Sequence, residues 1–181
     1  MSSAKVTKPT KVDGFVELYG PVKLQKSFGL NKMNSNNPAH NSWLAKTAVY
    51  WQLAVGREVF VLIDSLAQVK AFYCLSVARF SLSENAVRQH RVIMLTRMAI
   101  SEDANVPQTA ELLLRGVLIK AAKASQTGDF SALVIHATDE RLVELYGKFG
   151  FVGFQKTDHA TLLVKSMKAI RSEAWLAGHI D

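Results

Sequence analysis

Cysteine is nearly absent from this 181-residue chain, and so are long apolar runs. The single cysteine, Cys74, excludes an internal disulfide framework and is typical of proteins from a reducing compartment. The longest apolar runs are far shorter than the roughly 20 residues that a membrane-spanning helix requires. The N-terminal residues also lack the apolar core of a secretory signal. We therefore expect a cytoplasmic protein that does not associate with membranes.

Three functional patterns are missing as well. The sequence has no Gly-x-Ser-x-Gly elbow and no Gly-x-Gly-x-x-Gly turn, which disfavours a hydrolase and a dinucleotide-dependent enzyme. The histidines are scattered, and none has metal-ligand spacing to another histidine, a cysteine or a carboxylate. We therefore expect no metal site.

The chain is basic, with a formal net charge of +7. Such a charge attracts polyanions and favours nucleic acid as a partner, although solubility alone is an equally good explanation. Lysine and arginine are spread along the whole chain, so the sequence does not define a single patch. For each of these candidates, contact with an RNA backbone and an ordinary solvated face both remain open: Lys46, Arg79, Arg88, Arg91, Lys120 and Lys123.

The organisation predicts a basic N-terminal arm at residues 1–13 and one domain at residues 14–181. A short strand is expected at residues 15–18, ended by Gly20-Pro21, and a helix at residues 40–55, ended by Gly56. Apolar periodicity then predicts strands at 58–63, 69–82, 91–100 and 132–136, a helix at 107–124, a helix before Phe151, two further strands and a helix at 167–176. This order indicates an α/β fold with one mixed, mostly antiparallel central sheet and helices on both faces.

Four segments occur in a recognisable order: MNSNNPAHNSWL at 33–44, VKAFYCL at 69–75, LTRMAI at 95–100, and IHATDE at 135–140 followed by LYGKFGF at 145–151. Together they resemble the GNAT acetyltransferase superfamily over about residues 28–170. They are most similar to its bacterial toxin branch, whose members acetylate the amino group of aminoacyl-tRNA. The resemblance implies acetyl-CoA as donor, a homodimer, and a small DNA-binding antitoxin as partner.

Tyr146 is the catalytic residue that the resemblance implies. A phenol at that position would protonate the coenzyme A thiolate as the tetrahedral intermediate collapses. This requires two splayed central strands, with the hydroxyl at the mouth of the slot between them. The alternative is a helix tyrosine that packs under the following strand.

The cofactor-binding segments follow from the same resemblance. The backbone of Met98, Ala99 and Ile100 would pair with the pantetheine arm. The family's glycine-rich pyrophosphate loop corresponds here to residues 105–110, where only Ala110 fits the pattern, so binding of acetyl-CoA stays open. The other residues assigned to this cofactor site are Asn105, Gln108 and Thr109.

On the acceptor side, Arg97 lies in an apolar strand, where it either faces the substrate or pairs with a carboxylate. Trp43 is either a core residue or a stacking surface. With Arg79 and Lys46 they form the expected contacts to substrate or nucleic acid. Two alternatives remain: a GNAT-fold module that has lost acetyl-CoA and binds nucleic acid or a protein partner, and a nucleobase-modifying relative.

Overall fold

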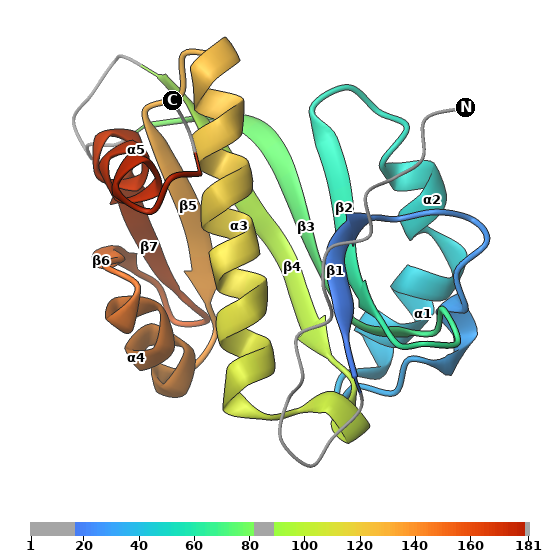
Figure 1. The fold of residues 1–181 in the computed structure, drawn as a ribbon. Coiled ribbons are helices and arrows are strands. Elements are labelled where there is room, and N and C mark those ends of the chain that lie inside the picture. The colour runs from blue at the N-terminus through green and yellow to red at the C-terminus, as the bar shows by residue number, and fades with distance from the viewer. Residues whose placement is uncertain (1–16, 82–88, 180–181) are drawn as a thin grey trace. The chain divides into compact units, whose positions relative to one another are not determined.

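The computed structural model describes residues 17–81 and 89–179. It divides into two compact units, Met1–Cys74 with Arg97–Leu113, and Leu75–Thr96 with Leu114–Asp181. Three elements, β3, β4 and α3, continue from one unit into the other (Figure 1). The predicted arm at residues 1–13 and the candidate Arg88 lie outside the described residues.

The strands form one seven-stranded sheet in the order β1-β2-β3-β4-β5-β7-β6. β4 and β5 are parallel, whereas β1 and β2, β5 and β7, and β7 and β6 pair antiparallel. The prediction of a mixed, mostly antiparallel sheet is confirmed. The strands are β1 (Tyr19–Lys23), β2 (Arg57–Ile63), β3 (Val69–Phe80), β4 (His90–Ile100), β5 (Ala132–Ala137), β6 (Val152–Lys156) and β7 (Thr161–Ser166).

In the first unit, the expected helix at residues 40–55 is wrong in extent. α1 (Pro38–Lys46) begins at a proline whose fixed φ suits a first turn, and Asn37 caps it by accepting from the N–H groups of Ala39 and His40. The helix stops because Thr47, with φ −121°, leaves the helical region. A four-residue helix, α2 (Ala48–Trp51), follows. Leu44 and Ala48 hold both helices on the core with Phe72 of β3.

The second unit contains α4 (Glu140–Lys148), α5 (Met167–Leu176) and most of α3 (Pro107–Thr127). Residues 132–135 of β5 are buried throughout, as expected for a strand covered on both faces. Asp139 caps α4 by accepting from the Leu142 N–H, and Ser166 caps α5 by accepting from the Ala169 N–H. α5 lies beside α3 in this unit (Figure 1).

The first strand also differs from the prediction. Gly20-Pro21 was expected to end a strand at residues 15–18, of which 15 and 16 lie outside the described residues. Instead, β1 begins at Tyr19 and includes both Gly20 and Pro21, joined by a cis peptide bond. The register against β2 shifts between Tyr19 and Val22, and an edge strand with such an irregularity accepts a proline that cannot donate.

Two short 3₁₀ turns, η1 (Leu30–Lys32) and η2 (Glu102–Ala104), complete the described elements. Across residues 17–81 and 89–179, none of the helices combines the length and the apolar character needed to cross a lipid bilayer.

Gly20 is predicted to be intolerant of a side chain. Its φ is +123°, and an added Cβ would lie 2.7 Å from the Val61 carbonyl oxygen and 2.9 Å from the Val22 nitrogen, both backbone atoms. Gly20→Ala should therefore lower the free energy of unfolding by about 3 kcal/mol in urea titrations. Gly147→Ala is the matched control, because nothing lies within 4 Å of its added Cβ and it should stabilise α4 by about 0.5 kcal/mol. Equal effects of the two substitutions would contradict this account of β1.

Candidate functional site

Tyr146 lies in the last turn of α4, which begins directly after β5. The helix ends at a tight turn in which the Tyr146 carbonyl accepts from the N–H groups of Phe149 and Phe151. The turn depends on Gly150, whose φ of +78° favours glycine. The position of Tyr146 is thus fixed by the strand before it and the glycine turn after it.

The phenol of Tyr146 is largely withdrawn from solvent. The residue is 4% exposed, and its ring packs edge-on against Phe151 with centroids 6.0 Å apart. Burial, with a smaller contribution from the Asp139 carboxylate, raises the pKa of Tyr146 to about 12. The hydroxyl therefore stays protonated at neutral pH, as a proton donor requires. The packing under the following strand is present as well, so the two interpretations of this residue do not exclude each other.

A buried lysine holds the end of the Tyr146 helix. Lys165 of β7 is 4% exposed, and its Nζ donates to the Phe149 carbonyl oxygen and to Glu173 of α5 at 2.7 Å. A Cβ on Gly150 would lie 3.0 Å from the same Nζ. One ammonium thus connects β7, α5 and the turn that follows Tyr146. The sequence analysis missed Lys165, although a lone charge at the end of the apolar run 162–164 was a usable signal.

The stretch over which β4 and β5 are paired is short. It runs from Val92 opposite Ala132 to Leu95 opposite Ile135, although β5 continues to Ala137 and β4 to Ile100. Beyond Leu95, β4 contains the predicted pantetheine-binding residues Met98, Ala99 and Ile100. Of these, only Ala99 is buried, at 8% exposed.

The loop between β4 and α3 is closed by its own hydrogen bonds. The Asn105 N–H donates to the Glu102 carbonyl at 3.3 Å, and the Val106 N–H donates to the Ala104 carbonyl at 3.0 Å. The Thr109 N–H donates to the Val106 carbonyl at 3.0 Å. Pro107 has no N–H to offer.

The side chains of the predicted cofactor loop differ in their exposure to solvent. Asn105 and Gln108 are exposed, Ala110 is half-buried, and Thr109 is fully buried. The Thr109 hydroxyl has no hydrogen-bond partner, so the first turn of α3 contains an unsatisfied polar atom that faces the interior.

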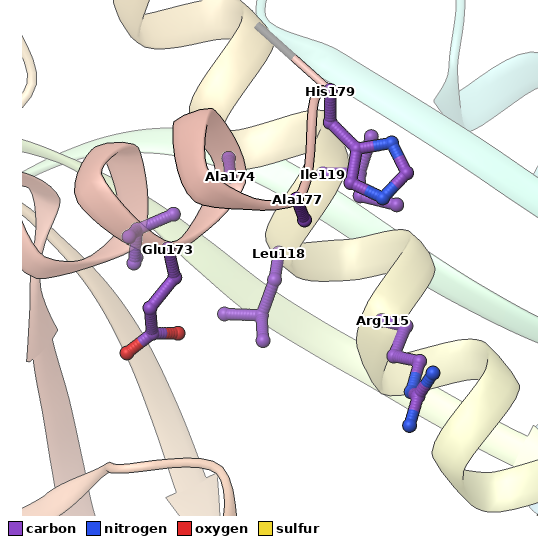
Figure 2. A pocket seen from close by; sticks show the side chains of 8 residues that line it. Arg115, Leu118, Ile119, Glu173, Ala174, Ala177 and His179 are labelled. Carbon is purple, nitrogen blue, oxygen red and sulfur yellow. The ribbon is translucent and has the colours of Figure 1, made fainter.

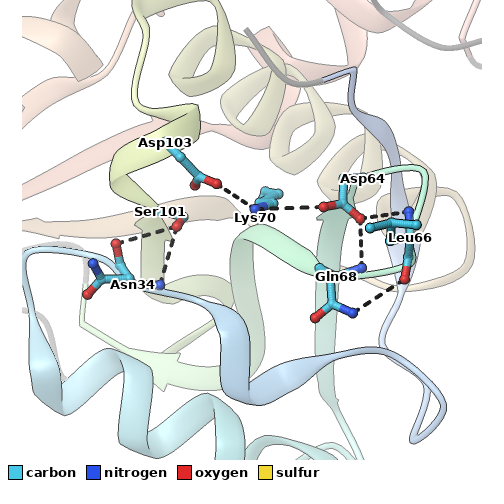
Figure 3. A network of polar contacts seen from close by, with 7 residues as sticks. All are labelled: Asn34, Asp64, Leu66, Gln68, Lys70, Ser101 and Asp103. Atoms are coloured by element: carbon cyan, nitrogen blue, oxygen red, sulfur yellow. Dashed lines mark hydrogen bonds and ion pairs between the residues drawn. The ribbon is translucent and has the colours of Figure 1, made fainter.

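A polar network fixes this loop to the rest of the first unit (Figure 3). Lys70 of β3 donates to Asp103 and lies 3.7 Å from Asp64. Ser101 exchanges hydrogen bonds with the backbone of Asn34. The hydrogen bond to Asp103 raises the pKa of Lys70. Burial is the largest single influence on Asp103 and by itself would raise its pKa, but the hydrogen bonds from Lys70 and Ser101 and the Lys70 charge together outweigh burial and lower that pKa. The sequence analysis assigned no role to these residues.

The structure brings two of the predicted acceptor residues together. The Arg97 guanidinium lies 4.8 Å from the centre of the Trp43 ring, and Trp43 stacks on Phe72 with centroids 5.8 Å apart. Among residues 17–81 and 89–179, no carboxylate lies within ion-pair distance of Arg97. Burial and the Arg97 charge lower the pKa of the neighbouring His40, which is therefore neutral at neutral pH. Arg97 thus uses an aromatic face where the sequence left a carboxylate partner open.

The other two acceptor candidates are exposed. Lys46 ends α1, one turn after Trp43, and belongs to the first unit. Arg79 is near the end of β3 and belongs to the second. The structure therefore shows a contact between Arg97 and Trp43, with Lys46 on the same helix as Trp43.

The second unit also contains two hollows. One of about 230 Å³ lies between α3 and α5, where apolar side chains are flanked by Arg115, Glu173 and His179 (Figure 2). Another of about 340 Å³ is polar and lies beside the N-terminus of α4 and the turn between β6 and β7. Within the described residues, no group of three or more His, Cys, Asp or Glu side chains is placed to hold a metal ion.

No protein-family model matches the chain, and no curated protein matches it in sequence. Solved structures match it in fold. One of them is a Tyr-to-Phe mutant of the AtaT toxin bound to the C-terminus of the antitoxin AtaR and acetyl-CoA, with a TM-score of 0.73, 18% identity, and coverage of 84% of this chain and 95% of that one. The chain has the GNAT fold.

Two further matching structures are complexes with other partners. AtaT complexed with acetyl-methionyl-tRNAfMet has a TM-score of 0.72, 18% identity, and coverage of 82% and 94%. The KacTA–DNA complex has a TM-score of 0.71, 19% identity, and coverage of 84% and 93%. At these identities the likeness establishes the fold, and the predicted resemblance to GNAT toxins is confirmed at that level.

Removal of the Lys165 charge should destabilise the protein. Lys165→Met leaves the Phe149 carbonyl without its donor and Glu173 without its partner, and we expect a loss of about 3 kcal/mol in the free energy of unfolding. Glu173→Gln is the milder comparison, because that side chain is 58% exposed and should cost less than about 1 kcal/mol. Urea titrations of both variants measure the difference. A Lys165→Met protein as stable as the parent would contradict the assigned role.

The Asp139 charge should be detectable at the Tyr146 phenol. Asp139→Asn removes a negative charge that favours the neutral phenol, so the pKa of Tyr146 should fall from about 12 while burial keeps it above the ordinary value of about 10. NMR titration of ring-labelled tyrosine measures this shift, and Tyr146→Phe assigns the signal. A rise in the pKa, or no change, would show that Asp139 does not act on the phenol.

Proposed function

We propose that this chain is an N-acyltransferase that moves an acyl group, such as acetyl, from a thioester to the primary amine of an aminoacyl-tRNA. The observation that carries the proposal is Tyr146, a protonated phenol at the end of α4, in a chain with the fold of the AtaT and KacT toxins. The AtaT complexes with acetyl-CoA and with acetyl-methionyl-tRNAfMet support this choice of donor and acceptor.

The reaction requires one proton-donating group from the protein. The neutral amine attacks the thioester carbon, a carbon–nitrogen bond forms, and the carbon–sulfur bond breaks with its electron pair on sulfur. The Tyr146 hydroxyl donates a hydrogen bond to that sulfur and then its proton, the amine loses a proton to water, and water returns a proton to the Tyr146 phenolate. Because an ordinary thiol has a pKa of about 8.5, the phenol acts chiefly by stabilising the developing negative charge.

The acceptor side of the proposal uses Arg97 and Trp43. The Arg97 guanidinium has no carboxylate partner among the described residues and lies over the Trp43 ring, and we assign its charge to contact with phosphate. Lys46 on the next turn of α1 adds charge, and Arg79 is a separate candidate. The net charge of +7 favours tRNA as a partner.

The donor side fits coenzyme A only in part. The β4 backbone at Met98 and Ala99 is not needed for charge recognition. The pyrophosphate requires free N–H donors, and those of Asn105, Val106 and Thr109 are used within the loop. These residues do not fit the pyrophosphate. The proposed role of the β4 backbone at residues 98–100 is therefore limited to the pantetheine arm and to the oxyanion.

An antitoxin, a homodimer and a cytoplasmic location belong to the same proposal. AtaT was solved with the antitoxin AtaR, and KacTA with DNA. The second candidate function is a GNAT-fold module that binds RNA or a protein and transfers nothing. The closed loop before α3 and the burial of Tyr146 favour it.

Tyr146→Phe should slow transfer without removing the fold. We expect kcat to fall by about 100-fold or more, because the departing sulfur loses its proton donor. The measurement is transfer of labelled acetyl from a thioester to charged tRNA, and Tyr50→Phe, at a tyrosine 69% exposed, is the matched control. Because the pKa of Tyr146 is about 12, the parental rate should show no loss from phenol ionisation up to about pH 10.

Two results would decide against this role. A Tyr146→Phe protein with the parental rate would remove Tyr146 from the chemistry. No transfer by the parental protein, together with salt-sensitive binding of RNA, would favour the second candidate function.

A further inference from the structure

Several of the donors that a pyrophosphate would need at the start of α3 are already engaged. Phosphate groups bind at helix N-termini because the first N–H groups have no intrahelical partner. Here the N–H groups of Asn105, Val106 and Thr109 already donate to carbonyls of the same loop, at 3.3, 3.0 and 3.0 Å. Pro107 supplies none. An anion would have to break these bonds before the loop could hold it.

Charge opposes an anion at the same place. Glu102 and Asp103 are exposed on the turn before the helix. The nearby cation, Lys70, is only 13% exposed and is shared between Asp103 and Asp64 (Figure 3). Three carboxylates and one ammonium leave this loop with a net negative charge, which repels phosphate.

The loop is also held in its closed form from outside. The Glu102 N–H donates to the Asn34 carbonyl at 2.9 Å, and the Ser101 N–H donates to the Lys70 carbonyl at 2.7 Å. The one unsatisfied side-chain group, the Thr109 hydroxyl, is fully buried and so is not offered to a ligand on the surface. The residues therefore resist the rearrangement that a pyrophosphate would demand.

We propose that this chain recognises its donor through the acyl-pantetheine arm alone, and that the donor is an acyl group on the phosphopantetheine of an acidic carrier protein. The inference rests on the proposed acyl transfer. The arm and thioester are the same as in acyl-CoA, but the carrier-bound arm brings no pyrophosphate to the α3 loop. The net charge of +7 complements a negatively charged carrier.

The chemistry balances as it does for any thioester. The acceptor nitrogen forms a bond to the acyl carbon, the carbon–sulfur bond breaks, and its electron pair stays on sulfur. The proton from Tyr146 gives the free thiol of the pantetheine arm, which remains attached to its carrier. The amine proton passes to water, and water returns a proton to the Tyr146 phenolate.

The test compares three acetyl donors with the full chain and one amine acceptor: acetyl-CoA, acetyl-pantetheine and an acetylated carrier protein. We expect kcat/KM for acetyl-CoA to stay within about 3-fold of acetyl-pantetheine, since the pyrophosphate adds no binding, and the carrier protein to exceed both by about 10-fold or more. A preference for acetyl-CoA over acetyl-pantetheine of about 100-fold would overturn recognition by the arm alone. A carrier protein no better than acetyl-pantetheine would overturn the carrier as the source.

A second test changes one charge at the loop and measures binding of coenzyme A, so it does not depend on the preparation of any acetyl donor. Glu102→Gln should strengthen binding of coenzyme A, measured by calorimetry, by about 3-fold, because it removes one repulsive charge at the loop. Asp129→Asn, at an exposed carboxylate after the other end of α3, makes the same change in charge and should have no such effect. Tight binding of coenzyme A by the parental protein, unaffected by Glu102→Gln, would overturn the proposal.

The two proposals fail differently. If none of the three donors gives transfer, acyl transfer itself is wrong. If acetyl-CoA alone gives transfer, the chain is an acyltransferase and only the inference about its donor is wrong.

Discussion

A buried charge that must find partners is the constraint on which the second unit depends. Lys165 lies inside β7, where an unpaired ammonium would be strongly unfavourable. It is stabilised by Glu173 and by the carbonyl at the end of α4, the negative end of that helix. This requirement explains why a glycine follows Phe149, since a Cβ there would approach the ammonium. The orientation of the Tyr146 helix is thus a consequence of how one lysine is satisfied.

The first unit also contains a lysine that needs charged partners, but here the pairing stabilises a different kind of segment. Lys70 pairs with Asp64 and Asp103, and through Asp103 it holds the turn that precedes α3. What is stabilised here is a closed loop whose N–H groups donate to its own carbonyls. The two lysines therefore have opposite implications for function. One supports the helix of the proposed proton donor, and the other supports a loop that is poorly suited to phosphate.

Periodicity and turn residues were sufficient to predict the sheet and most helices, because the strands at 57–63, 69–80 and 132–137 are nearly continuous apolar runs. They failed where one residue decides the backbone: Thr47 divides the first helix, and Gly20 admits Pro21 into β1. The sequence showed that the Arg97 charge needs a partner. It did not show that this partner is Trp43, since that contact joins β4 to α1. The charge of Lys165 after the apolar run 162–164 was a usable signal, but the partners of Lys165 and Lys70 could not be predicted, because a pairing between distant strands, helices and turns leaves no mark on local sequence.

Tyr146 and the loop before α3 differ in how far packing accounts for them. Tyr146 is positioned by the glycine turn after it and by the buried lysine that donates to that turn. Packing against Phe151 explains the ring of Tyr146 but not its hydroxyl, since a phenylalanine would fill the same space. Conversely, packing explains little of the loop before α3, whose residues 102, 103, 105 and 108 are exposed. The Tyr146 hydroxyl is thus a polar group that packing does not require, whereas the loop before α3 has engaged N–H groups and exposed carboxylates that do not suit an anion. The proposed transfer from a thioester whose carrier brings no pyrophosphate to this loop agrees with both observations.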